Sequence, residues 1–198
     1  MILKVNGTKL DVTLEDEKTV GDVLKAFENE AFKNDATTVS IKLNGKDIDA
    51  DHFDEAAGEE LKEDTELDLT VISKADLKES FAENAANFKN LAEKLKEVSV
   101  FMQSSREKDA GAVIKLLADE IDAFCHTATL SALFPDVYES LKIEGQDAGT
   151  FFNELSPLLS DLKSALETKD IVTVGDLSEY EISPRLEKLS EAILKASE

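Results

Sequence analysis

The spacing of hydrophobic residues changes near Ser73, and this change divides the chain into two parts. Before Ser73, apolar residues alternate with polar ones, which is the period of a half-buried β-strand. After Ser73, apolar residues recur every three or four positions, as on one face of an α-helix. The pattern predicts an α+β protein with domains at residues 1–73 and 74–198. Because each part has its own apolar face, we expect each domain to fold independently.

The first domain is predicted to contain two hairpins around one helix. Asn6-Gly7 and Asn44-Gly45 accept the positive φ that a type I′ turn requires, and a short strand is expected to open at Ile48 after the second turn. Thr19 is expected to cap the helix, and the acidic stretch 49–64 to form a loop with a helical turn. The apolar positions of the other strands are Leu3 and Val5; Leu10, Val12 and Leu14; Val39, Ile41 and Leu43; and Leu67, Leu69 and Val71.

This order of elements (hairpin, helix, strand, short strand, last strand) resembles the β-grasp of the ubiquitin-like superfamily over residues 1–73. The resemblance implies recognition of a partner through an exposed face or edge of the sheet, or a role as a rigid spacer. A modifier or sulfur carrier of this superfamily needs a free C-terminal Gly-Gly, whereas the last strand here runs into Ser73-Lys74-Ala75-Asp76. A ferredoxin-type cluster needs four cysteines, and this domain has none. Neither role is expected.

The second domain is predicted to be an antiparallel bundle of four or five amphipathic helices. The first helix is expected to run from Leu77 to Met102, and the second to end before Pro135. Asp170 is a predicted helix cap after a short link, and Tyr180 is expected to pack inward. Further boundaries are predicted at Ser104-Ser105-Arg106, at a loop marked by Gly145 and Gly149, at Pro157, where the third helix kinks or restarts, and at Ser183-Pro184.

The chain is strongly acidic, with 43 Asp and Glu against 22 Lys and Arg and a net charge of −21. This charge argues against nucleic acid, whose affinity comes from cations that neutralise phosphates, and against an anionic membrane surface. No apolar run is long enough to span a bilayer, and the first residues turn polar too soon for a signal peptide. Cys125 is the single cysteine, in agreement with a reducing compartment. We therefore expect a bacterial cytoplasmic protein.

Candidate chemistry is sparse. Asp122 and His126 share a helix face with Cys125 beside them, which could supply metal ligands or orient a histidine toward a thiol. The only other histidine, His52, lies in the first domain, so no metal and no cofactor are expected. The paired carboxylates of Glu179-Tyr180-Glu181 point to different helix faces and are expected to be solvated.

The absence of a catalytic motif favours a non-enzymatic interaction protein, either an adaptor or a chaperone-like factor with a basic or amphipathic protein partner. The predicted bundle resembles bacterial secretion chaperones, including flagellin export chaperones, and ubiquitin-like components also occur in type VII secretion; both resemblances suggest a role in secretion. Phe101, Met102 and Phe134 are the candidate protein-binding residues. The alternative is an enzyme with an unrecognised site in the bundle or at the domain junction, which a deep pocket around Asp122, Cys125 and His126 would favour.

Overall fold

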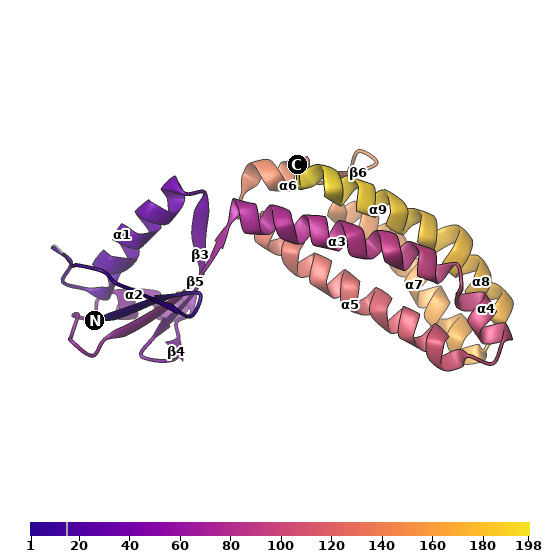
Figure 1. Ribbon diagram of the computed structural model, residues 1–198, viewed down its shortest axis with the longest axis horizontal. Helices are drawn as coiled ribbons and strands as arrows, with labels where there is room; N and C mark the ends of the chain where they lie inside the picture. The colour runs from indigo at the N-terminus through magenta and orange to yellow at the C-terminus, as the bar shows by residue number, and fades with distance from the viewer. Residues whose placement is uncertain (15) are drawn as a thin grey trace. The chain divides into compact units, whose positions relative to one another are not determined.

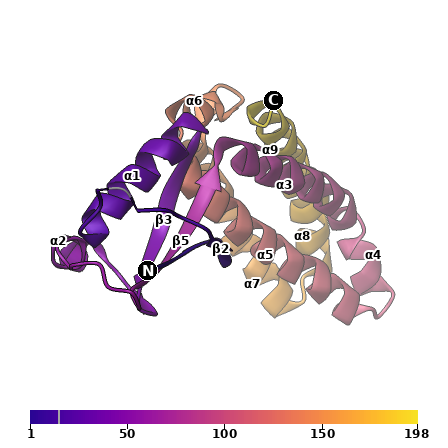
Figure 2. The ribbon, with the colours of Figure 1, turned by 60° about the vertical axis from the view of Figure 1, so that its left-hand side comes forward.

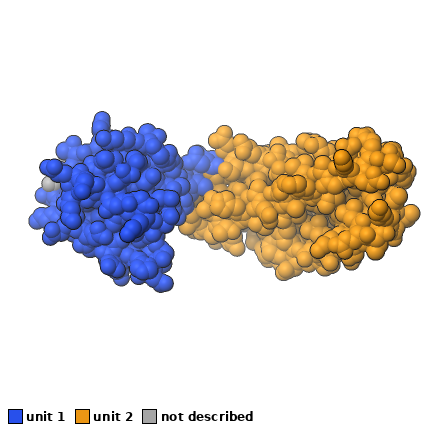
Figure 3. Space-filling model, turned by 90° about the horizontal axis from the view of Figure 1, so that it is seen from below, with its two compact units in different colours: residues 1–76 blue, residues 77–198 orange. Residues whose placement is uncertain are grey.

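The computed structural model describes residues 1–14 and 16–198 and divides into two compact units. The first unit is Met1–Asp76 and the second is Leu77–Glu198, shown in different colours in Figure 3. The first unit holds a mixed five-stranded sheet and the second is mainly helical, so the predicted α+β class is confirmed. None of the helices within the described ranges is long and apolar enough to cross a membrane.

The sheet of the first unit has the strand order β2-β1-β5-β3-β4. β1 pairs with β5 in parallel, and the other neighbours pair antiparallel. Both predicted hairpin turns are present, with φ of 49° and 76° at Asn6 and Gly7 and of 51° and 79° at Asn44 and Gly45. The strands are β1 (Ile2–Val5), β2 (Thr8–Leu10), β3 (Ala36–Leu43), β4 (Lys46–Asp47) and β5 (Glu66–Ser73) (Figure 1).

One long helix, α1 (Val20–Lys33), lies against this sheet (Figure 2). Thr19 caps it as predicted, in a capping box in which Asp22 accepts the backbone N–H of Thr19 in return. Two short helical turns, η1 (Ala50–His52) and α2 (Phe53–Ala57), follow β4. The order of elements that carries the ubiquitin-like resemblance is present, while the family assignment stays a prediction. The buried core comprises Leu3, Val20, Val23, Leu43, Ala56, Leu67 and Leu69.

The returning strand is shorter than predicted. β2 ends at Leu10, so Val12 and Leu14 lie outside any strand. Leu10 pairs with Leu3, and β1 begins only one residue before Leu3. Among the residues that the structure describes, those after Leu10 therefore have no neighbouring strand with which to exchange ladder hydrogen bonds.

The second unit is built on the long helices α3 (Lys74–Leu95), α5 (Glu107–Ser131), α7 (Ala148–Thr168) and α9 (Ser183–Ala196). Phe124 of α5 contacts the rings of Phe81 and Phe88 on α3 and of Phe152 on α7, with centroids 5.7–6.2 Å apart. On α9, Ser183 Oγ donates to Ala92 O at 2.9 Å and Ser190 Oγ donates to Ala85 O at 2.7 Å. Because the partner number on α3 falls as the number on α9 rises, these two helices are antiparallel.

Short helices connect the long ones, and here several boundaries differ from the prediction. The first helix ends at Leu95, where Glu97 N–H bonds to Lys94 O and tightens the last turn, and α4 (Val98–Gln103) follows separately. α6 (Pro135–Ser140) and α8 (Ile171–Asp176) are the other connectors, and Asp170 caps α8 as predicted. Pro157 lies inside α7 without ending it.

A small hairpin, which the sequence did not predict, precedes α7. Its strands are β6 (Lys142–Ile143) and β7 (Gln146–Asp147). Glu144 and Gly145 form the turn with φ of 51° and 84°, the combination that a two-residue type I′ hairpin requires. Gly149 is not in this loop but in the first turn of α7.

Tyr180 does not pack inward as predicted; its side chain is 65% exposed. It lies in a π-helical segment, η2 (Leu177–Ile182), which ends just before Pro184. Pro184 has no N–H to donate to the carbonyl four residues earlier, and its ring displaces that carbonyl, which belongs to Tyr180. The wider π turn shifts the helical register, so that Ser178 and Ile182 are buried instead.

Candidate functional site

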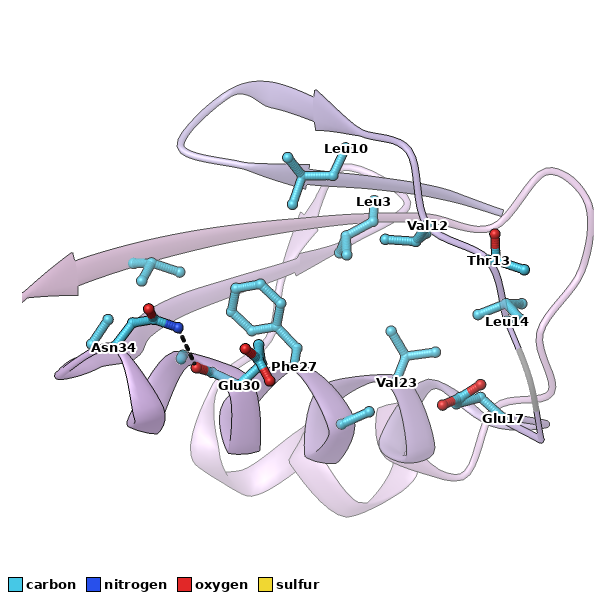
Figure 4. A pocket seen from close by; sticks show the side chains of 14 residues that line it. Leu3, Leu10, Val12, Thr13, Leu14, Glu17, Val23, Phe27, Glu30 and Asn34 are labelled. Carbon is cyan, nitrogen blue, oxygen red and sulfur yellow. Dashed lines mark hydrogen bonds between the residues drawn. The ribbon is translucent and has the colours of Figure 1, made fainter.

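An apolar groove lies in the first unit between α1 and the segment that follows β2 (Figure 4). We call it the β2–α1 groove. Its volume is about 480 Å³, which lies within the usual range of ligand pockets. The apolar side chains that line it are Leu3, Leu10, Val12, Leu14, Val23, Ala26, Phe27, Ala31, Ala36 and Val71.

One wall of the groove is the extended segment from Leu10 to Leu14. Leu10, Val12 and Leu14 alternate in sequence, all line the groove, and are 38%, 43% and 39% exposed. The backbone N–H groups of Asp11–Leu14 donate to no acceptor in the part of the chain that the structure describes. This wall therefore presents apolar side chains together with unpaired backbone groups, which is the arrangement that templates the addition of another strand.

β2 itself is an edge strand with one free side. Val5 pairs with Thr8 and Leu3 pairs with Leu10. In a two-residue hairpin these are the hydrogen-bonded pairs, so the intervening Lys9 directs its backbone groups away from β1. The free edge and the segment from Asp11 to Leu14 form one continuous line of available backbone groups.

The opposite wall is α1. Figure 4 shows Val23 and Phe27 rising from this helix toward Leu10 and Val12. The capping box fixes where the helix begins, and the backbone N–H groups of Lys18 and Thr19 hold the pKa of the Asp22 carboxyl below its usual value. The position of this wall is thus set by hydrogen bonds as well as by burial of Val23.

The rim of the groove is acidic. The carboxylates of Glu17 and Glu30 line it, and Asp11 and Asp16 flank the exposed segment. Glu30 is paired with Lys33 at 2.8 Å on the exposed side of α1. Residues 1–73 hold 19 carboxylates against 8 lysines, so the groove lies in a negative field.

The protein-binding residues predicted from sequence do not form one surface. Phe134 precedes α6 and is buried with 8% exposure, so it offers no anchor. Phe101 and Met102 are half-buried on α4, at the opposite end of the second unit from α6 (Figure 1). The guanidinium carbon of Arg106 lies 4.5 Å from the centre of the Phe101 ring, above the ring face, and Arg106 is held by Asp109 at 2.6 Å. Phe101 and Arg106 both line a hollow of about 410 Å³.

Asp122, Cys125 and His126 lie together on α5, and all three are exposed. They line neither the β2–α1 groove nor the hollow at Phe101. Partial burial, with a smaller contribution from the Asp122 charge, raises the pKa of the Cys125 thiol, which disfavours the reactive thiolate. Among residues 1–14 and 16–198, no group of three or more His, Cys, Asp or Glu side chains is arranged to hold a metal ion.

A third cavity, of about 290 Å³, lies in the second unit where the β6–β7 hairpin meets α7, η2 and α9. Tyr180, Arg185 and Lys188 all line it, whereas Glu179 and Glu181 do not. Its lining is polar, in contrast to the β2–α1 groove.

The groove is not among the predicted features, although the sequence contains a signal for it. Leu10, Val12 and Leu14 are three alternating apolar residues, but the pairing of β2 with β1 ends at Leu10, opposite Leu3, because β1 begins at Ile2. Because antiparallel strands pair residue by residue, the segment that contains Leu10, Val12 and Leu14 extends beyond the paired part of β1. The excess apolar residues are the wall of the groove.

Comparison with known proteins finds two family models, one for each part of the chain. Residues 1–73 match the family model described as TP0873 N-terminal domain, and residues 79–192 match the one described as Domain of unknown function (DUF8042). The second match covers more than half of the chain, which therefore belongs to the DUF8042 family.

Among curated proteins, the chain is similar to an "Uncharacterized protein" of Treponema pallidum (strain Nichols). The two are 32% identical over 194 residues, which cover 98% of this chain and 96% of that protein. No solved structure matches.

Proposed function

We propose that this protein is a non-enzymatic interaction module, an adaptor or chaperone-like factor, that binds an extended segment of a protein partner in the β2–α1 groove. The observation that carries the proposal is the wall of the groove, where Leu10, Val12 and Leu14 expose alternating apolar side chains and the backbone N–H groups of Asp11–Leu14 have no acceptor among the described residues. A partner segment that adds as a strand would pair its backbone with this wall, and its alternate side chains would enter the groove. The ubiquitin-like β-grasp assignment of the first unit is part of the same proposal.

The acidic residues near the groove favour a partner segment with basic ends. The carboxylates of Glu17 and Glu30 line the apolar groove, and Asp11 and Asp16 are neighbours in sequence of residues that line it. A partner segment with Val or Ile at alternate positions and Lys or Arg at both ends would complement the groove in both respects. Because long-range attraction is screened within about 10 Å at 0.1 M salt, its association rate is expected to fall as salt rises while its dissociation rate changes little.

A designed peptide tests the proposal directly. The probe is a capped decapeptide in which a central Val-Ile run is flanked by two lysines at each end, titrated into the ¹⁵N-labelled full chain. We expect the amide resonances of residues 8–14 and of α1 to shift. A second peptide with N-methylated central residues keeps the side chains but removes the backbone donors, and it is expected to bind at least about tenfold more weakly because strand pairing is lost.

The chain offers a matched pair of variants for the same titration. Val12 and Val39 are both exposed valines of the first unit, 43% and 37% exposed, but only Val12 lines the groove. Val12→Asp is expected to weaken peptide binding by about tenfold or more, because it places a charge against an apolar floor, and Val39→Asp to leave binding unchanged. Equal effects of the two variants, or no binding of the lysine-flanked peptide at millimolar concentration, would show that the groove is not a strand-docking site.

A further inference from the structure

The polar cavity of about 290 Å³ in the second unit is assembled from four separate elements. The β6–β7 hairpin contributes Gln146, α7 contributes Phe151 and Glu154, η2 contributes Tyr180, and α9 contributes Arg185, among others. Side chains far apart in sequence thus converge on one concave surface, as in small-ligand sites.

Two irregular pieces of backbone build this cavity. The left-handed Glu144 in the hairpin turn carries its carboxylate to Lys188 of α9, and the ion pair of 2.6 Å ties the hairpin to that helix. The π-helical turn before Pro184 brings Tyr180 to the cavity wall. π-helical turns are rare and are found frequently at functional sites.

Two charged groups of the cavity, Arg185 and Glu154, can form further hydrogen bonds. Arg185 donates through Nη1 alone, to the backbone oxygen of Glu181 at 2.8 Å and to its carboxylate at 2.7 Å. Its Nε and Nη2 have no partner within the described chain. The carboxylate of Glu154 likewise has neither a hydrogen bond nor an ion pair among the residues that the structure describes. One cation is therefore held in place with its outer donors free, and one carboxylate is unpaired in the same cavity.

We infer that this cavity binds a small zwitterion of the α-amino-acid type. The free Nε and Nη2 donors of Arg185 suit a carboxylate, which an arginine fork binds through two parallel hydrogen bonds. Glu154 suits the ammonium group, and Phe151 provides apolar surface for a side chain. The site is separate from the β2–α1 groove, and the inference does not depend on what that groove binds.

Ligands of a single charge fit the cavity less well. An anion such as phosphate would meet Arg185 and Lys188 but also the carboxylates of Glu144 and Glu154, in a chain with net charge −21. A simple cation would meet the two basic groups instead. A zwitterion presents one group of each sign, so that Arg185 and Glu154 can each pair with a group of opposite charge.

The test is an NMR titration of the ¹⁵N-labelled full chain with each of the twenty common free amino acids. At least one is expected to shift the resonances of Gln146, Phe151 and Tyr180. For each amino acid that binds, the N-acetyl derivative lacks the ammonium and the amide derivative lacks the carboxylate, and both are expected to bind at least about tenfold more weakly. The N-acetyl derivative also imitates a peptide C-terminus. If it bound as tightly as the free amino acid, the site would recognise a carboxylate alone and the inference would be wrong.

Variants locate the binding. Arg185→Gln is expected to weaken amino-acid binding at least about tenfold, whereas Arg106→Gln, at the only other arginine, leaves it unchanged. Arg185 also bonds to Glu181, so its substitution could disturb folding. Glu154 has no partner in the described chain, and Glu154→Gln is therefore the second variant. It should weaken binding of the free amino acid but not of its N-acetyl derivative. Absence of any binding, or equal effects of Arg185→Gln and Arg106→Gln, overturns the inference.

Discussion

Gly175 of α8 packs against Ser99 of α4, and its replacement by alanine tests the packing of the second unit. A Cβ built on Gly175 would lie 2.9 Å from Cβ of Ser99, closer than two carbon atoms approach without displacement. Gly111 in α5 is the matched control, since a Cβ added there meets nothing within 4 Å. Both glycines are helical, and neither has a positive φ.

The two variants separate helix propensity from steric overlap. Alanine stabilises a helix interior by about 1 kcal/mol relative to glycine, so Gly111→Ala is expected to raise the free energy of unfolding by about that amount. Gly175→Ala has the same propensity gain but must displace Ser99, and overpacking of this kind costs about 1–3 kcal/mol. The difference between the variants cancels the propensity gain, so Gly175→Ala is expected to be about 1–3 kcal/mol less stable than Gly111→Ala.

Urea unfolding followed by far-UV circular dichroism measures this difference. Removing the Cβ of Ser99 in the double variant Ser99→Gly/Gly175→Ala should recover stability beyond the sum of the single effects, because the two residues are in contact. The reasoning about this contact is refuted if Gly175→Ala is as stable as Gly111→Ala, or if the two single effects add.

Three further expectations are independent of these glycines. The Thr173 hydroxyl and backbone N–H lower the pKa of the Asp170 cap, so the contribution of Asp170 to stability is present above the ordinary Asp pKa near 3.8 and is lost as pH falls through the lower folded value. In urea unfolding, the loss of unfolding free energy caused by Asp170→Asn should therefore shrink on acidification, and a constant loss would contradict this. Alkylation of Cys125 by iodoacetamide at pH 7.5 should be slower than that of free cysteine, because burial and Asp122 raise the thiol pKa, and a faster rate would contradict this. A fragment of residues 1–76 should unfold cooperatively and give dispersed amide resonances, since it has its own core, and a random-coil spectrum would rule out independent folding.

Local sequence signals predict the fold class because they act over a few residues. Asn6-Gly7 forms its turn and Thr19 caps α1 through contacts that the neighbouring residues alone determine. Strands β3 and β5 are predicted for the same reason, because alternation of apolar and polar residues within a short segment is enough to indicate a half-buried strand.

The features that the sequence did not predict depend on how one element pairs with or joins another, rather than on the pattern within a single segment. β2 ends at Leu10 because of where β1 begins, which alternation within the segment cannot show. The exposure of Tyr180 depends on Pro184, four residues later. In the sequence, Pro184 indicates the start of a helix; in the fold, its missing N–H causes a π turn in the preceding residues. Phe134, a predicted surface anchor ahead of a proline, is buried where α6 begins.

Charge cannot decide which unit of this protein meets which ligand. Residues 1–73 hold 19 carboxylates and 8 lysines, and residues 74–198 hold 24 carboxylates and 14 basic residues, so each part has an excess of about ten negative charges. A long-range field that is nearly equal on both parts raises encounter rates with any basic partner but does not choose between sites. Selection must come from short-range chemistry, and there the two cavities differ. The β2–α1 groove offers apolar side chains and, among the described residues, backbone groups without partners, which suit the extended chain proposed for it. The polar cavity offers charges of both signs, which suit the small zwitterion inferred for it. Substitutions within either cavity should therefore act on dissociation rates. Added salt should slow association at the β2–α1 groove alone, because a zwitterion without net charge is not steered by the long-range field.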